Sequence, residues 1–95
     1  MVESEFQRRV IQRLKIEFPD CVVMKQDASY KQGIPDLVIF HKDRYAMLEV
    51  KKSAKASHQP QQDYYISKFN DWSFASFVYP ENVDQVFEQL KGVFA

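Results

Sequence analysis

The chain has 95 residues, 45% of them hydrophobic and 27% charged, and its formal net charge is zero. This composition is typical of one folded domain, here residues 1–95, and it excludes a disordered or collagen-like chain. No apolar run approaches the roughly 18 residues of a membrane span, and the first residues do not resemble a signal peptide, so we expect a cytoplasmic protein. A single cysteine, Cys21, excludes an internal disulfide.

The charges are unevenly distributed along the chain. Residues 25–58 carry seven Lys/Arg against four acidic residues, whereas residues 59–95 carry two against five. Zero net charge argues weakly against nucleic-acid binding, since domains that bind nucleic acid are usually basic. The basic surplus of the middle segment points the other way, although a solvated surface of mixed charge explains it equally well.

The first third of the chain predicts a helix followed by a short strand. Residues 3–18 form an amphipathic pattern with an apolar residue every fourth position; these are Phe6, Val10, Leu14 and Phe18. Ser4 is a candidate N-cap, and Pro19 ends the helix. The apolar run Cys21–Lys25 predicts a strand, and the polar residues 26–32 form a connection.

Two further apolar runs, Gly33–Phe40 and Tyr45–Lys51, predict a β-hairpin. We favour a four-residue loop, His41–Arg44, over a two-residue loop, because Lys-Asp is not a preferred two-residue turn. In either case, paired residues have numbers that sum to 85, so Asp36 lies opposite Glu49 and Lys51 follows on the same face. Apolar residues on both faces of this hairpin predict central strands that are covered on both sides.

The remainder predicts a helix, a strand and a second helix. Residues 52–59 are a polar loop, and a helix begins near Ser57 or Gln59 with Pro60 in its first turn. Residues 73–79 are aromatic and β-branched and predict a strand. The last helix follows Pro80 and has an apolar stripe of Val83, Val86, Phe87 and Leu90. The order α-β-β-β-α-β-α predicts an α/β fold with a mixed central sheet flanked by helices.

The carboxylates of Asp36 and Glu49, about 5 Å apart at Cβ, would repel one another in an apolar sheet. A divalent cation between them relieves this repulsion. Both side chains, with the backbone carbonyl of Val50, are suitable ligands for Mg²⁺ or Mn²⁺. Such a cation makes hydroxide available near neutral pH and binds a phosphate, while Lys51 can position the water or offset charge. The pattern therefore predicts metal-assisted cleavage of phosphodiester bonds.

Pro35-Asp36, followed after twelve residues by Glu49-Val50-Lys51, resembles the motif of PD-(D/E)XK nucleases. The segment 33–37, Gly-Ile-Pro-Asp-Leu, is similar to the G-x-P-D-L segment of the compact VRR-NUC branch, and the likeness covers roughly residues 4–80. The resemblance implies the restriction-endonuclease-like αβββαβ core. It also implies a catalytic Gln62 and a further metal-binding carboxylate on the first helix, for which Glu5 is the better match and Glu3 the alternative.

We expect a homodimer that acts on DNA shape, because one such site cuts one strand and a small domain has little surface for reading sequence. The resemblance to stand-alone VRR-NUC proteins, often encoded by phages and then acting in the host cytoplasm, implies a branched substrate such as a four-way junction. Two alternatives remain open. One is a restriction-like or homing endonuclease on duplex DNA, and the other is a nucleic-acid-binding module without catalysis.

Other residues carry weaker signals. Four lysines flank the predicted site and are candidates for phosphate contacts; they are Lys25, Lys31, Lys52 and Lys55. Neither histidine has a partner at zinc-binding spacing. With two glycines and no Gly-rich phosphate loop, the chain has no predicted nucleotide cofactor. The alternative to a metal site is a purely structural role for these residues. Asp36 would then cap backbone amides, and Glu49 and Lys51 would form a salt bridge.

Overall fold

The computed structural model describes residues 1–95 as three helices and four strands. Their bounds, in chain order, are α1 (Glu3–Glu17), β1 (Val22–Lys25), β2 (Leu37–His41), β3 (Arg44–Val50), α2 (Pro60–Trp72), β4 (Phe74–Val78) and α3 (Val83–Val93). This is the predicted element order, and each element lies within a few residues of its predicted range. None of the three helices combines the length and the apolar composition that a membrane span requires.

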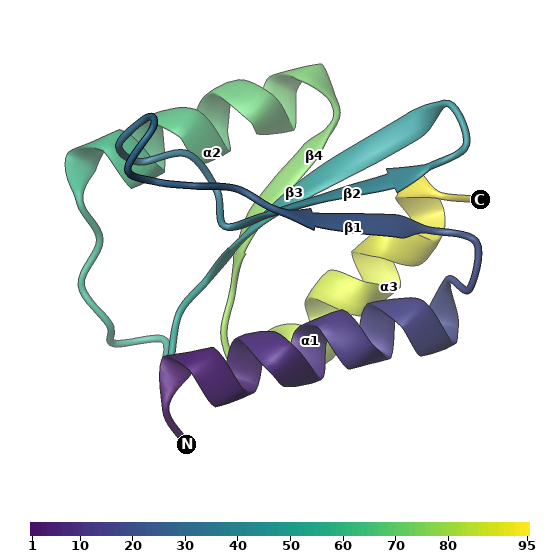
Figure 1. Cartoon of the computed structure of the whole chain (residues 1–95), viewed down its shortest axis with the longest axis horizontal. Coiled ribbons are helices and arrows are strands. Elements are labelled where there is room, and N and C mark those ends of the chain that lie inside the picture. Colours follow the sequence, from purple (N-terminus) through teal and green to yellow (C-terminus); the bar gives the residue numbers. More distant parts are fainter.

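The strands form one sheet in the order β1-β2-β3-β4. Strands β1, β2 and β3 are antiparallel, and β4 is parallel to β3 because helix α2 connects them as a crossover. Helices α1 and α3 lie on one face of the sheet, and α2 lies on the other (Figure 1). The prediction of an α/β fold with a mixed sheet flanked by helices is confirmed.

The core lies between the sheet and the α1/α3 pair. Alternate residues of β2 and β3 point into it, and the helices contribute their apolar stripes; the fully buried members include Leu14, Leu37, Ile39, Leu48 and Phe87. The opposite sheet face is covered less completely. Helix α2 has no fully buried residue, so its contacts leave part of this face open.

The hairpin register is as predicted, but its loop is shorter. Leu37 pairs with Leu48, and His41 pairs with Arg44, so every observed pair sums to 85. The loop is therefore Lys42-Asp43, with Lys42 at φ 59°, and the prediction of a four-residue loop is wrong. His41 is therefore the last residue of β2, and its ring centroid lies 5.3 Å from that of Phe94.

Two further predictions need correction. Ser4 does not cap α1, because the helix begins at Glu3 and Val2 occupies the cap position without a side-chain hydrogen bond. The central strands are not both covered on two sides, since Phe40 of β2 is 43% exposed. Helix α2 lies against β4 and β3, so its cover does not extend across β2 to β1.

Candidate active site

Three of the predicted site residues meet where the β2–β3 ladder ends. The last pair of that ladder is Leu37 with Leu48, and β3 ends two residues later at Val50. Asp36 immediately precedes β2, and Glu49 is the second-last residue of β3. The two acidic residues therefore face one another at the same end of the sheet. Lys51 follows Glu49 by two residues on the same face.

Each of the two carboxylates accepts a hydrogen bond from a backbone N–H of the opposite segment. The N–H of Asp36 donates to Glu49 Oε1 at 3.1 Å, and the N–H of Val50 donates to Asp36 Oδ2 at 2.9 Å. Side chains thus replace the backbone partners that the ladder would supply if it continued. This arrangement fixes both carboxylates against the backbone of the opposite segment.

Gln62, in the first turn of α2, connects Glu49 with Lys51. Its Oε1 accepts a hydrogen bond from Lys51 Nζ at 2.8 Å, and its Nε2 donates to Glu49 Oε2 at 2.9 Å. The N–H of Gln59 also donates to Gln62 Oε1, at 3.1 Å. Because an ammonium and an N–H only donate, these contacts fix which end of the Gln62 amide faces each neighbour.

The charge of this cluster is poorly compensated. Glu49 is 4% exposed and Lys51 is 8% exposed, and Lys51 Nζ lies 3.9 Å from Glu49 Oε2. Burial, and then the negative charge of Asp36, raises the pKa of Glu49 to about 8 despite the neighbouring lysine. Burial also raises the pKa of Asp36, against the hydrogen bond from Val50 and the charge of Lys51.

The segment before Asp36 is held by contacts that no local pattern predicts. Gly33, at φ +91°, passes so close to α2 that a Cβ on it would lie 2.3 Å from Cβ of Gln61. Gln26 donates its backbone N–H to the carbonyl of Asp36 at 2.8 Å and its Nε2 to that of Pro35 at 3.1 Å. The polar sequence of residues 26–32 predicts only a connection and gives Gln26 no particular role. The glycine of the Gly-x-Pro-Asp segment is the sequence feature that could have indicated the close approach of Gly33 to α2.

The carboxylate predicted on α1 does not join the cluster. Glu5 pairs with Arg9, with 3.2 Å between Oε1 and the guanidinium. Glu3 is the α1 residue whose charge acts on Glu49, where it raises the pKa slightly. The structure thus brings together Asp36, Glu49, Lys51 and Gln62, with Val50 beside them. No group of three His, Cys, Asp or Glu side chains is placed to hold a metal ion.

The four candidate phosphate-binding lysines are all exposed. Lys25 ends β1, opposite Leu37, and Lys31 lies in the connection from β1 to β2. Lys52 and Lys55 lie in the connection from β3 to α2. Both connections leave the sheet at the end that carries the carboxylates (Figure 1). The exposed lysines therefore lie on the segments that border the cluster.

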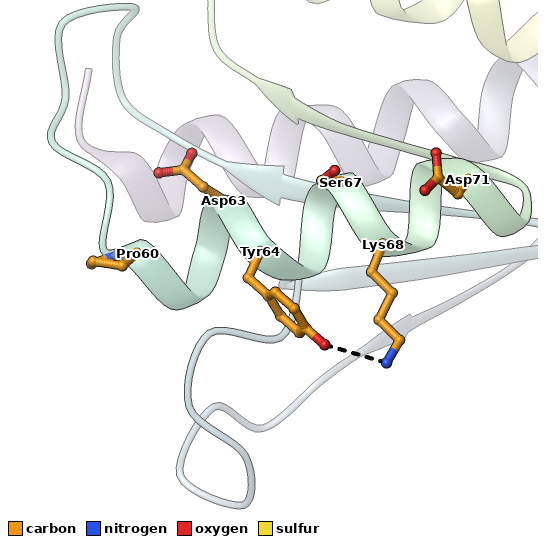
Figure 2. Close-up of a pocket in the computed structure, with 6 residues that line it drawn as sticks. All are labelled: Pro60, Asp63, Tyr64, Ser67, Lys68 and Asp71. Atoms are coloured by element: carbon orange, nitrogen blue, oxygen red, sulfur yellow. Dashed lines mark hydrogen bonds between the residues drawn. The ribbon is translucent and has the colours of Figure 1, made fainter.

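A hollow on the surface lies elsewhere. It has a volume of about 650 Å³, lies on the outer side of α2, and is lined by Pro60, Asp63, Tyr64, Ser67, Lys68 and Asp71 (Figure 2). None of these residues belongs to the carboxylate cluster. The cluster is instead a closely packed group of polar side chains at the end of the central strands β2 and β3.

Comparisons with protein-family models, with curated proteins and with solved structures gave no match. The functional interpretation therefore depends on the geometry of the cluster and on the motif that its residues form.

Proposed function

We propose that this protein is a divalent-metal-dependent nuclease that hydrolyses phosphodiester bonds in DNA. The observation that carries this proposal is the opposed pair Asp36 and Glu49, held at the end of the sheet with one lysine beside it. Capping the two backbone amides does not require carboxylates, because Asn and Gln side chains accept the same hydrogen bonds without charge. Two neighbouring carboxylates raise the electrostatic energy of the folded chain, and a bound cation would lower it.

The residues present fit Mg²⁺ or Mn²⁺. Such ions bind proteins through one or two carboxylates and take their remaining ligands from water and substrate phosphates. Asp36 and Glu49 would hold the ion, with the backbone carbonyl of Val50 as the further ligand predicted from the sequence. The ion does not need a third carboxylate. On α1, Glu3 is the residue whose charge raises the pKa of Glu49. When bound, the ion would supply an activated water and polarise the scissile phosphate.

Lys51 and Gln62 have separate roles in this proposal. Lys51 would orient the attacking water and offset the negative charge that develops on the phosphate. Gln62 would position Lys51, because its Oε1 accepts from the ammonium and its Nε2 is anchored on Glu49. The element order and these four side chains are those that the resemblance to the PD-(D/E)XK nucleases and their VRR-NUC branch implies for an αβββαβ core.

We further propose a branched DNA substrate, such as a four-way junction, and action as a homodimer. The chain presents no Arg on the segments that border the cluster, and exposed lysines contact phosphates without reading bases. Recognition would then depend on DNA shape, and two protomers would be needed to cut two strands.

The test incubates purified protein with a four-way junction, linear duplex and supercoiled plasmid, in Mg²⁺, in Mn²⁺ and in EDTA. Wild type should cut the junction only with a metal ion, and Asp36→Asn and Lys51→Ala should each lower the rate roughly 10²-fold or more. Two exposed residues away from the cluster provide matched controls, namely Asp43→Asn at the hairpin tip and Lys15→Ala on α1. Both controls should cut like wild type.

Cutting of linear duplex as fast as of the junction would contradict the branched substrate and favour a restriction-like or homing endonuclease. DNA binding with no cleavage in any metal would contradict catalysis and favour a binding module. Equal cleavage by wild type and both site variants would show that the cluster is not the active site.

A further inference from the structure

Helix α2 and the strands β1 and β2 leave an apolar face open to solvent. Its exposed side chains, hereafter the α2–β1 face, are Val22 and Met24 of β1, Phe40 of β2, and Tyr64 and Trp72 of α2. They are 43–63% exposed. Large solvent-facing apolar side chains are normal when scattered singly, but a contiguous group marks an interaction site.

The strand part of this face is contiguous. Val22 pairs with Phe40, and Met24 pairs with Val38, so the side chains of these residues lie next to each other on one side of the sheet. Phe40 continues the row to Tyr45 of β3. None of these side chains is charged.

The helix part lies on the same side of the sheet as the strand part, the side opposite the core (Figure 1). Gln61 contacts Gly33 in the β1–β2 connection, which identifies the side of α2 that is turned toward β1 and β2. The helical period places Lys68 and Trp72 on this same side. On the other side, Asn70 accepts a hydrogen bond from the N–H of Ala75 in β4. Tyr64 and Lys68 project from α2 away from Asp63, Ser67 and Asp71 (Figure 2).

Aromatic contacts make the helix part a continuous strip. Neighbouring ring centroids lie 5.1 Å apart for Tyr64 and Tyr65, 5.7 Å for Tyr65 and Phe69, and 5.4 Å for Phe69 and Trp72. Lys68 Nζ lies 5.6 Å from the Tyr64 ring and 5.4 Å from the Trp72 ring. These contacts hold Trp72 and Tyr64 in place before any partner binds, which reduces the entropy lost on binding.

We propose that the α2–β1 face is the surface through which two copies of this chain associate. The five exposed side chains present on the order of 500 Å² of apolar surface, at 150–250 Å² for a fully exposed large side chain. With the half-exposed residues around them, this approaches the roughly 800 Å² that each partner buries in a stable complex of standard size. DNA is a poorer fit, because Lys68 is the only cation on the face and two aspartates, Asp63 and Asp71, lie on the same helix.

A second copy also fits the charges. A two-fold axis brings the same surface of both copies together, and the one cation on that surface, Lys68, already lies against the Tyr64 and Trp72 rings of its own chain. The inference names the partner surface of the proposed dimeric nuclease, but it rests on exposed side chains and not on cleavage. Oligomeric state and cleavage can therefore fail independently.

Light scattering and sedimentation, from low micromolar to near-millimolar protein, test this directly. Wild type should reach twice the mass of one chain. Trp72 is the only tryptophan, so its emission should shift to shorter wavelength over the same concentration range as its ring is buried. Met24→Glu should raise the dissociation constant at least about tenfold, because a carboxylate would be buried at the interface twice.

The matched control is Ile16→Glu, on the opposite side of the molecule in α1, where the side chain is 78% exposed. It should associate like wild type, and circular dichroism should show both variants folded. Three results would overturn the proposal. These are a monomer at every concentration, a dimer that Met24→Glu weakens no more than Ile16→Glu does, and a monomer whose Trp72 emission is quenched by single-stranded DNA, which would assign the face to unpaired bases.

Discussion

Replacing Asp36 by Asn should stabilise the metal-free protein while abolishing its response to Mg²⁺. Asn keeps a side-chain oxygen that can accept the hydrogen bond from the N–H of Val50, now 2.9 Å from Asp36 Oδ2. It removes the negative charge that lies opposite Glu49. The substitution therefore separates the electrostatic role of Asp36 from its role as a backbone cap.

The magnitude follows from the distance between the two acidic residues. Two unit charges about 5 Å apart interact by roughly 3 kcal/mol at an effective dielectric constant of about 20. Asp36 is half-buried and Lys51 offsets part of its charge, so screening reduces the gain to about 1–2 kcal/mol at a pH at which Glu49 is ionised, near and above its pKa of about 8. In a domain of this size, such a gain raises Tm by about 5–10 °C.

The pH dependence has a definite sign. The pKa of Glu49 is about 8 in the folded protein, above its ordinary value of 4.5, because of burial first and the charge of Asp36 second. The folded state therefore retains a proton that the unfolded chain releases between these values. The metal-free protein should lose stability as pH rises from about 4.5 to about 8, and Asp36→Asn should lose less over the same window.

Thermal and urea unfolding of both proteins in EDTA, from pH 5 to pH 8.5, measure these differences. Adding Mg²⁺ at ten times its dissociation constant should stabilise wild type by about 1.4 kcal/mol and leave the variant unchanged. Asp43→Asn, at the exposed hairpin tip, should behave like wild type throughout. The reasoning is refuted if Asp36→Asn is less stable than wild type at pH 8, or if it keeps the Mg²⁺ response.

Further predictions concern the segment and the helix that position the cluster. Gly33→Ala should destabilise the protein by about 2–3 kcal/mol in urea unfolding and slow cleavage, because its Cβ would lie 2.3 Å from that of Gln61 at a φ of +91°. Gly92→Ala is the control, since nothing lies within 4 Å of its added Cβ, and it should be neutral or slightly stabilising. Gln62→Ala should lower stability by about 1 kcal/mol, since it leaves Lys51 without its hydrogen bond, and it should reduce the cleavage rate with little change in DNA affinity.

The pairing at the end of the hairpin could be derived from the sequence because a turn centred between Lys42 and Asp43 gives pairs that sum to 85 for either even loop length. Only a loop of odd length would shift the register by one residue and move Glu49 to the other face. The position of the turn therefore predicted that Asp36 faces Glu49. The length of the loop did not follow, because two-residue and four-residue loops between His41 and Arg44 give the same register.

Contacts between distant segments were not predictable in the same way. The residues between β1 and β2 have no hydrophobic period, so nothing local indicated that Gln26 would bond the carbonyl of Asp36. Which glutamate of α1 faces the cluster depends on how the helix is rotated. Glu3 and Glu5 are about 200° apart around the helix axis, so only one of them can face the cluster, and the sequence of α1 does not fix that rotation.

Zero net charge does not describe the surface that a DNA strand would meet at this end of the sheet. Residues 25–58 carry a surplus of three positive charges, seven basic against four acidic residues, and two of these acidic residues are Asp36 and Glu49. Those carboxylates face each other, and a divalent cation would neutralise them. Phosphates would then meet the exposed Lys25, Lys31 and Lys52 with little opposing charge.

Two measurable consequences follow for DNA affinity. Affinity should be higher in Ca²⁺, which occupies a hard oxygen site, than in EDTA. At most about four lysine–phosphate contacts are available per protomer, so the slope of log affinity against log salt should not exceed about −4 for one protomer. A basic binding module without a metal site would bind equally well in EDTA. Equal binding in Ca²⁺ and in EDTA would show that the lysines alone account for the DNA affinity. It would therefore contradict the proposed metal site.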